Sequence, residues 1–248
     1  MKIFDCHLHI INPKYPLIEN QGFIPKPFTV DDYKNRMKDL QVIGGAVVSS
    51  SFQEFDQKYL RNALQTLGNR FVGVTQLPYH TSDNEILKLH TLGVRAIRFN
   101  VKRGGSEDIS KLDYLARKVY ELVKWHTELY IDAKSLTEIR SIIEKLPAVT
   151  IDHLGLSRVG LENMLYLVNR GLRVKATGFG RIDFDAGKVM RLIYEINPDA
   201  LMFGTDLPST RANRPFQEAD IELILDTFTE KESEKILYKN ALHWYRIN

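Results

Sequence analysis

The first apolar run of the chain reads Lys2-Ile3-Phe4-Asp5-Cys6-His7-Leu8-His9-Ile10. Its length and its alternation of apolar and polar residues predict a β-strand. Residues two apart on a strand project to the same side, so Asp5, His7 and His9 are expected on one face and Cys6 on the other. Two neighbouring imidazoles on one face are typical of a metal site or of acid–base chemistry.

Similar short runs recur along the whole chain and alternate with longer amphipathic stretches. The predicted strands are Lys2 to Ile10, Val42 to Phe52, Phe71 to Tyr79, Val94 to Val101, Leu129 to Ala133, Val149 to Leu154, Leu172 to Thr177 and Leu201 to Asp206. The predicted helices are Asp31 to Leu40, Gln53 to Leu67, Asn84 to Thr91, Ile109 to His126, Ser135 to Leu146, Leu161 to Asn169, Ala186 to Ile196 and Gln217 to Phe228.

This alternation predicts parallel βαβ units and an α/β fold. Eight units in 248 residues suit a single (β/α)8 TIM barrel, with residues 1–248 forming one domain. A doubly wound open sheet is the alternative, but it usually carries a glycine-rich phosphate turn after its first strand. His7-Leu8-His9 stands where that turn would begin, which favours the barrel.

Composition narrows the classes of partner. Hydrophobic residues make up 44% of the chain and charged residues 26%, and the formal net charge is +3, too small to indicate nucleic-acid binding by itself. Cys6 is the one cysteine, so an internal disulfide is excluded, which is compatible with a reducing compartment. No segment has the length of a membrane span, and Asp5 and the histidines interrupt the first apolar run, unlike a signal peptide. We therefore expect a cytoplasmic protein that acts on a small molecule without a nucleic-acid or membrane partner, and a homo-oligomer stays open.

Polar and titratable residues gather at the C-terminal ends of the predicted strands, the rim on which TIM barrels build their sites. They are His7 and His9 on strand 1, Ser49 to Ser51 on strand 2, Arg98 and Asn100 on strand 4, Asp152 and His153 on strand 6, Lys175 to Arg181 on and after strand 7, and Asp206 on strand 8. A purely structural origin does not predict such clustering. The other histidines, His80, His90, His126 and His243, are expected in loops or helices with structural or solvent-facing roles.

Five short motifs occur in the order of a known superfamily. They are His7-Leu8-His9, Gly93 to Asn100, Asp152-His153-Leu154-Gly155, Gly204-Thr205-Asp206-Leu207-Pro208 and Lys239 to Tyr245. In this order they resemble the amidohydrolase superfamily, and more closely the amidohydrolase-related branch that contains 2-pyrone-4,6-dicarboxylate lactonase and sugar-lactone hydrolases. The resemblance covers the whole chain. One departure is Ser209-Thr210, where many relatives carry a histidine, so the substrate is expected to differ in detail.

The resemblance implies a hydrolase that opens a small carboxylated lactone. Asp206 would be the general base and then the general acid, while His7, His9 and His153 would polarise the lactone carbonyl. Arg98 and Arg181 would clamp substrate carboxylates. Ser50, Ser51, Tyr130 and Lys175 are further candidates for substrate binding, and Arg103, Arg211 and Arg214 are open between functional and structural roles. Asp5 could orient a histidine, and Cys6 is expected to pack in the core.

The resemblance leaves the metal question open. Metal enzymes of the superfamily commonly add a strand-5 ligand, and the predicted strand 5, with its flanks at residues 128–134, holds no histidine. We therefore favour catalysis without a cofactor. If a divalent zinc or manganese ion is bound, His7, His9, His153 and Asp206 would be its ligands. The alternatives are a metal-dependent sugar-lactone hydrolase or decarboxylase of the same superfamily, a metal-dependent nuclease or phosphoesterase, and a non-catalytic barrel that binds a small acid.

Overall fold

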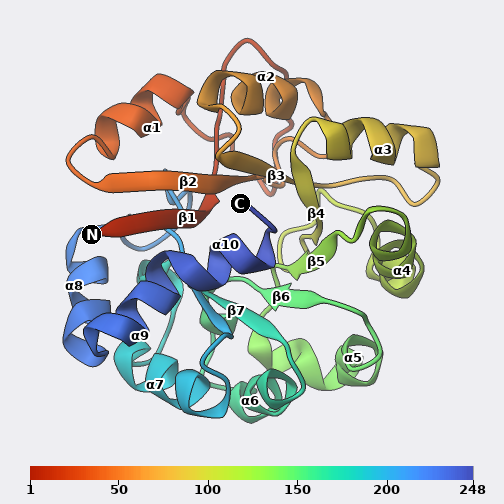
Figure 1. Ribbon diagram of the computed structural model, residues 1–248. Coiled ribbons are helices and arrows are strands. Elements are labelled where there is room, and N and C mark those ends of the chain that lie inside the picture. The colour runs from red at the N-terminus through yellow and green to blue at the C-terminus, as the bar shows by residue number, and fades with distance from the viewer. Residues whose placement is uncertain (248) are drawn as a thin grey trace.

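Eight parallel strands form the centre of the molecule and follow one another in chain order around the sheet (Figure 1). The structure, a computed structural model, describes residues 1–247. The strands are β1 (Lys2–Leu8), β2 (Gln41–Val48), β3 (Phe71–Thr75), β4 (Val94–Phe99), β5 (His126–Leu129), β6 (Val149–Ile151), β7 (Arg173–Ala176) and β8 (Leu201–Phe203). The predicted (β/α)8 barrel is confirmed.

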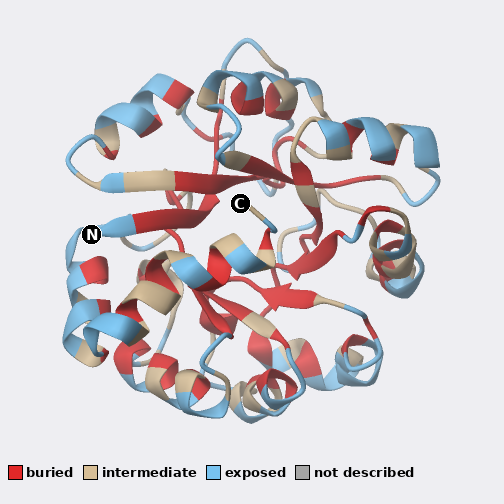
Figure 2. Cartoon of the chain, viewed as in Figure 1, coloured by how far each residue is buried: buried red, intermediate tan, exposed pale blue. Residues whose placement is uncertain are grey.

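Helices surround this barrel on the outside, and their outer faces are exposed while the strands are buried (Figure 2). The helices are α1 (Val30–Arg36), α2 (Lys58–Leu67), α3 (Asp83–Thr91), α4 (Leu112–Val123), α5 (Leu136–Ile143), α6 (Leu161–Asn169), α7 (Ala186–Ile196), α8 (Ala219–Thr227), α9 (Glu230–Glu234) and α10 (Asn240–Trp244). Among residues 1–247, no helix is both long and apolar enough to traverse a bilayer.

The first and last strands meet at a seam held by backbone hydrogen bonds. The amide of Asp206 donates to the carbonyl of His7 at 2.7 Å, and the amide of His9 donates to the carbonyl of Leu207 at 2.8 Å. Gly204 makes this approach feasible, because a Cβ at that position would lie 2.7 Å from the backbone nitrogen of His7. The seam therefore brings the histidine motif of β1 directly beside the Gly-Thr-Asp motif that follows β8.

A register shift between Asp5 and Leu8 alters which side chains of β1 face the interior. Phe4 and Cys6 pack inside the barrel with Met202, although the alternation predicted the opposite side for Cys6 from the histidines. Asp5 instead points outward, where its carboxylate accepts from the Tyr33 hydroxyl of α1 at 3.1 Å. The predicted shared face of Asp5 with His7 and His9 is therefore wrong, because a bulge changes the side of the strand. The predicted packing role of Cys6 agrees with its buried position.

Strand β5 begins earlier than the sequence predicts. Helix α4 ends at Val123 and the strand runs from His126 to Leu129, so His126 is a strand residue and strand 5 does contain a histidine. The prediction failed because Lys124 ends the helix in the left-handed conformation at φ 60°, where sequence usually signals a stop with glycine. Other predicted strands overrun at their C-terminal ends, as at β8, because those residues leave the ladder to form the rim.

Helix α10 crosses the end of the barrel opposite the rim (Figure 1). The Trp244 indole of this helix donates to the Thr150 hydroxyl of β6 at 2.9 Å, and the Tyr245 hydroxyl that follows it donates to Glu128 of β5 at 2.5 Å. Phe4 packs on the Tyr245 ring with centroids 5.8 Å apart. These contacts fill the lower part of the barrel, at the end away from the rim.

Candidate active site

The carboxylate of Asp206 lies at the centre of the rim and is fully buried. Its Oδ1 atom is 3.7 Å from His9 Nε2 and 3.9 Å from the Nε2 atoms of both His7 and His153. These separations exceed hydrogen-bond length, and Oδ1 has no hydrogen-bond partner among the described residues. Three imidazoles thus face one unpartnered carboxylate oxygen, and the space between them is suited to a small polar group.

The other oxygen of Asp206 is paired. Arg181, which lies in a short 3-10 turn (Phe179–Arg181) after β7, donates from Nε to Oδ2 at 2.6 Å and from Nη2 to the Thr210 carbonyl at 2.8 Å. Burial alone would raise the pKa of Asp206, but the charge of Arg181 holds this pKa well below its usual range. Asp206 is therefore a carboxylate at neutral pH.

The hydrogen bond at Nδ1 decides which nitrogen of a neutral His9 ring would carry the proton. Its Nδ1 atom lies 2.7 Å from the carbonyl oxygen of Val48, which can only accept a hydrogen bond. Nδ1 of the neutral ring therefore carries the proton, and Nε2, which faces Asp206, is an acceptor.

His153 stands in a backbone conformation that glycine prefers, with φ 52°, in the turn after β6. Its Nδ1 atom is buried without a hydrogen-bond partner among the described residues, and it faces Gly178, where a Cβ would come within 2.6 Å of it. Burial lowers the pKa of His153 well below its usual value, so the ring is neutral. Since a buried N–H without an acceptor is costly, the proton is better placed on Nε2, toward Asp206.

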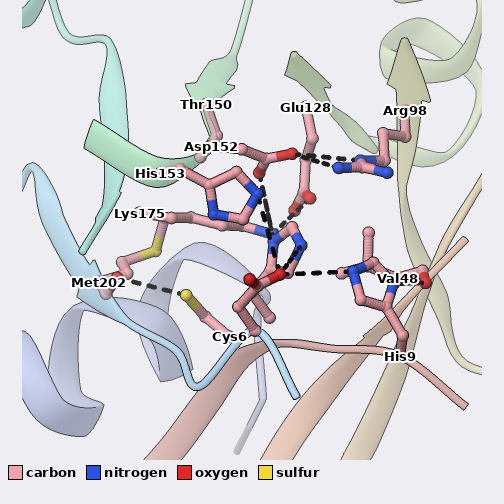
Figure 3. A network of polar contacts seen from close by, with 12 residues as sticks. Cys6, His9, Val48, Arg98, Glu128, Thr150, Asp152, His153, Lys175 and Met202 are labelled. Atoms are coloured by element: carbon pink, nitrogen blue, oxygen red, sulfur yellow. Dashed lines mark hydrogen bonds and ion pairs between the residues drawn. The ribbon is translucent and has the colours of Figure 1, made fainter. Parts of the chain in front are cut away.

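Beneath these groups lies a buried network of polar contacts (Figure 3). Lys175 of β7 forms an ion pair of 2.5 Å with Glu128 Oε2 and is 3.3 Å from His7 Nδ1. Glu128 Oε1 accepts from the Tyr245 hydroxyl and lies 3.0 Å from His126 Nε2. Burial lowers the pKa of His7 to about 3, so this ring is neutral as well. Lys175, predicted to bind substrate, lies under the pocket and not in its wall.

Arg98 of β4 joins the same network from the side. Its Nε and Nη2 atoms donate to Asp152 Oδ2 at 3.1 and 2.8 Å, and Nη1 donates to the Ser49 carbonyl at 2.8 Å. Burial alone would raise the pKa of Asp152, but the charges of Arg98 and Lys175 hold it well below its usual range. Asp152, which the sequence places on the rim and to which no role was assigned, is therefore a further candidate residue of the site.

The rim carries a pocket that is open to solvent. Its wall includes residues predicted for substrate binding and others that were not. The lining residues are His9, Ser50, Ser51, Phe52, Arg98, Asn100, Arg103, Tyr130, His153, Arg181, Asp206, Thr210 and Arg211. Ser50 is oriented by Gln53, whose side-chain oxygen accepts from the Ser50 hydroxyl at 3.0 Å, and the Tyr130 ring lies edge-on to His153 at 5.1 Å.

Four of these lining side chains are arginines and one is a carboxylate. Arg98 and Arg181 are each paired with a buried aspartate, whereas Arg103 and Arg211 form no ion pair within residues 1–247. The Arg211 guanidinium lies over the rings of both Phe23 and Phe52, 4.9 and 4.8 Å from their centroids. The uncompensated positive charge of the pocket therefore lies with Arg103 and Arg211, which sequence reasoning left undecided.

The donor set at the rim fits a divalent metal. Ligand atoms of His7, His9 and Asp206 lie within 4.8 Å of one another, and both His7 Nε2 and Asp206 Oδ1 are buried without hydrogen-bond partners in the described chain. Imidazole nitrogen and carboxylate oxygen are the ligands that catalytic zinc prefers, with one position left open. His126, the strand-5 histidine, does not contribute, because its Nε2 is engaged by Glu128 in the lower part of the interior.

Comparison with known proteins identifies relatives that match over most of the chain. The chain is 25% identical to a 2-pyrone-4,6-dicarboxylate hydrolase of Comamonas testosteroni, over 97% of this chain and 89% of the relative. It is also 25% identical to a 4-sulfomuconolactone hydrolase of Rhizobium radiobacter, over 83% of this chain and 75% of the relative.

The fold likewise matches solved structures. A probable 2-pyrone-4,6-dicarboxylic acid hydrolase from Acinetobacter baumannii, with citric acid bound, superposes with a TM-score of 0.85 at 21% identity, covering all of both chains. The family model described as amidohydrolase matches residues 4–247. By this match over nearly its whole length, the chain belongs to the amidohydrolase family.

Proposed function

We propose that this protein is a hydrolase that opens a small lactone carrying at least one anionic group. The observation that carries the proposal is the unpartnered Asp206 Oδ1, faced by three imidazoles at 3.7–3.9 Å in a pocket walled by arginines. The two relatives described above are named as hydrolases of anionic lactones, which supports the same reaction class.

Water activation is assigned to Asp206 together with His9. Both Asp206 Oδ1 and His9 Nε2 are acceptors that face the same space, so a water between them can donate one hydrogen to each. The water oxygen attacks the lactone carbonyl carbon as one of its protons passes to Asp206. This assignment differs from the sequence-based hypothesis, in which His9 donates to the carbonyl.

The carbonyl oxygen becomes negatively charged in the tetrahedral intermediate. His7 and His153, each with a proton on Nε2, would donate to this oxygen and stabilise it. When the ring C–O bond breaks, Asp206 returns its proton to the leaving oxygen. The depressed pKa of Asp206 favours this last step, because a strong acid gives up its proton readily.

The charges of the pocket support an anionic substrate. Arg98 and Arg181 are already paired with Asp152 and Asp206, and we assign them to holding those carboxylates and to secondary contacts with the substrate. Arg103 and Arg211 are assigned to the anionic group itself, since their charge is uncompensated within the described chain. Ser50, Ser51 and Tyr130 add neutral hydrogen-bonding groups to the wall.

The reaction as proposed requires no metal ion. If a zinc or manganese ion is bound, His7, His9 and Asp206 would hold it, with His153 as the further candidate ligand, and the ion would supply Lewis-acid polarisation of the carbonyl and a more acidic water. A metal-dependent lactonase is therefore the second candidate, and its support is the fit of this donor set.

The test is a hydrolysis screen of carboxylated lactones and their methyl esters, run with chelator and with added zinc or manganese. We expect turnover of carboxylated lactones in chelator, and a fall of roughly 10²–10⁴-fold in kcat for Asp206→Asn with substrate affinity retained. Asp226→Asn, which changes an exposed carboxylate far from the rim, is the matched control. Turnover that appears only with added metal would select the second candidate. Binding of an acid without hydrolysis of any lactone under either condition would overturn both.

A further inference from the structure

The side chain of Lys175 is fully buried, and its ammonium group faces both carboxylate and imidazole groups (Figure 3). Nζ is 2.5 Å from Glu128 Oε2, 3.7 Å from Asp152 Oδ1 and 3.3 Å from His7 Nδ1. Two carboxylates this close favour the charged form of the lysine. Because Lys175 is absent from the pocket wall, its influence on a bound substrate must pass through a neighbour.

His7 Nδ1 has two neighbours at the same distance but of opposite hydrogen-bonding character. The Lys175 ammonium, at 3.3 Å, can only donate, and the Asp152 carboxylate oxygen Oδ1, also at 3.3 Å, can only accept. A neutral imidazole carries one proton, so the partner chosen by Nδ1 decides where that proton sits. Pairing with Asp152 places it on Nδ1, and pairing with Lys175 places it on Nε2.

The contacts favour Lys175. The Lys175–His7 contact has hydrogen-bond geometry, whereas Asp152 Oδ1 has no hydrogen-bond partner in the described chain. We propose that Lys175 is a positioning residue whose ammonium donates to His7 Nδ1 and thereby holds the single proton of His7 on Nε2, facing Asp206. This inference rests on the proposed function and deepens it, because it makes His7 a hydrogen-bond donor to the lactone oxygen.

The two histidines of the β1 motif then have opposite roles. The Val48 carbonyl fixes His9 as an acceptor at Nε2, and Lys175 fixes His7 as a donor at Nε2. A donor is useful for the developing oxyanion but cannot coordinate a metal, since a metal requires the lone pair of the same atom. For His7 to become a metal ligand, its proton must move from Nε2 to Nδ1, where it would be donated to Asp152 Oδ1. Lys175 therefore favours the metal-free form of the site.

The decisive measurement is the protonation of the His7 ring by ¹⁵N NMR of metal-free protein, with His7→Gln used to assign the signals. We expect the proton on Nε2 in the wild type. Lys175→Met leaves Glu128 buried without its cation and is expected to fold poorly, so the working variant is the double change Lys175→Met with Glu128→Gln. In it we expect the proton on Nδ1, with Glu128→Gln alone and the exposed Lys188→Met as controls that keep the wild-type pattern.

Zinc affinity gives a second readout that does not depend on turnover. We expect zinc to bind roughly 10–100-fold more tightly to the double variant than to Glu128→Gln alone, measured by competition with a chelator. A wild-type His7 proton on Nδ1, or a proton that stays on Nε2 in the double variant, would overturn the inference. Neither result depends on whether the protein hydrolyses lactones, so failure of the proposed function would be seen separately.

Discussion

Arg211→Met tests whether the two unpaired arginines of the pocket, Arg103 and Arg211, bind the anionic group of the substrate. The Arg211 guanidinium lines the pocket and lies over the rings of Phe23 and Phe52. Its Nη1 atom donates to the side-chain oxygen of Asn20 at 3.2 Å, and Nη2 donates to the Asn20 backbone carbonyl. Its Nε atom is buried and has no hydrogen-bond partner within residues 1–247. Methionine keeps most of the aliphatic stem and its contact with the two rings, so the substitution removes mainly the charge and its hydrogen bonds.

The magnitude follows from one charge-assisted hydrogen bond. Such a bond is worth about 1.5–3 kcal/mol, and about 1.4 kcal/mol corresponds to a factor of ten. Arg211 is partly exposed, so water screens it and the lower half of this range is expected. KM for a carboxylated lactone should therefore rise by roughly 10–40-fold, while kcat changes little because the reacting atoms lie at Asp206.

The assay compares a carboxylated lactone with its methyl ester for each variant. Arg211→Met should lose kcat/KM for the carboxylated substrate and keep it for the ester. Arg214→Met is the matched control, because its guanidinium pairs with Asp220 outside the pocket wall. Asn20→Ala separates the charge from the side-chain contact, since it removes the hydrogen bond to Asn20 Oδ1 and leaves both the cation and its hydrogen bond to the Asn20 backbone carbonyl. Equal losses for both substrates, or losses in Asn20→Ala as large as in Arg211→Met, would refute the reasoning.

Three further predictions concern buried groups of the site. Arg181→Met removes the cation that holds the pKa of Asp206 low, so the acid limb of the kcat/KM profile should move to higher pH. The free energy of unfolding should fall by about 3–5 kcal/mol, because a buried ion pair loses one partner. An unmoved acid limb would argue against Asp206 as the titrating base. Burial raises the pKa of Asp5 to about 6, so its stabilising contribution is complete below about pH 4 and is lost as pH rises through 6. In urea unfolding, the wild type should lose about 3 kcal/mol of unfolding free energy relative to Asp5→Asn over that range. Parallel curves of unfolding free energy against pH for the two proteins would contradict this. Gly178→Ala would place a Cβ 2.6 Å from His153 Nδ1 at φ 61°, so kcat should drop and the protein should be destabilised. The control Gly22→Ala, at φ 73° with nothing within 4 Å, should show only the destabilisation from backbone strain. Equal effects of the two variants on kcat would show that His153 is not displaced.

Much of this architecture could be predicted because it depends on local periodicity. The alternation of apolar runs and amphipathic stretches is a property of consecutive residues, and the position of His7, His9, His153 and Asp206 at strand ends followed from it. In a parallel barrel all strand ends of one sense meet at the same rim, so their gathering needed no knowledge of contacts.

The remaining features depend on contacts that local sequence does not encode. The bulge in β1 arises from its register with β2, and the early start of β5 follows a lysine that ends α4 without glycine. One signal was available: His126 and Glu128 repeat the i, i+2 spacing of the β1 histidines. The pairing of Arg98 with Asp152 joins residues 54 apart, and only the folded barrel shows that their charges are already satisfied.

The seam between β1 and β8 ties activity to the completion of folding. His7 and Asp206 meet only when the first strand hydrogen-bonds to the segment after the last one, a contact that spans almost the whole chain. Contacts of such long sequence separation form late, because the chain loses the entropy of a long loop before the new contacts stabilise the closed state. A partly assembled barrel of six or seven strands would have native helices but no water-activating centre. Recovery of turnover during refolding should therefore report closure itself and lag behind the return of secondary structure.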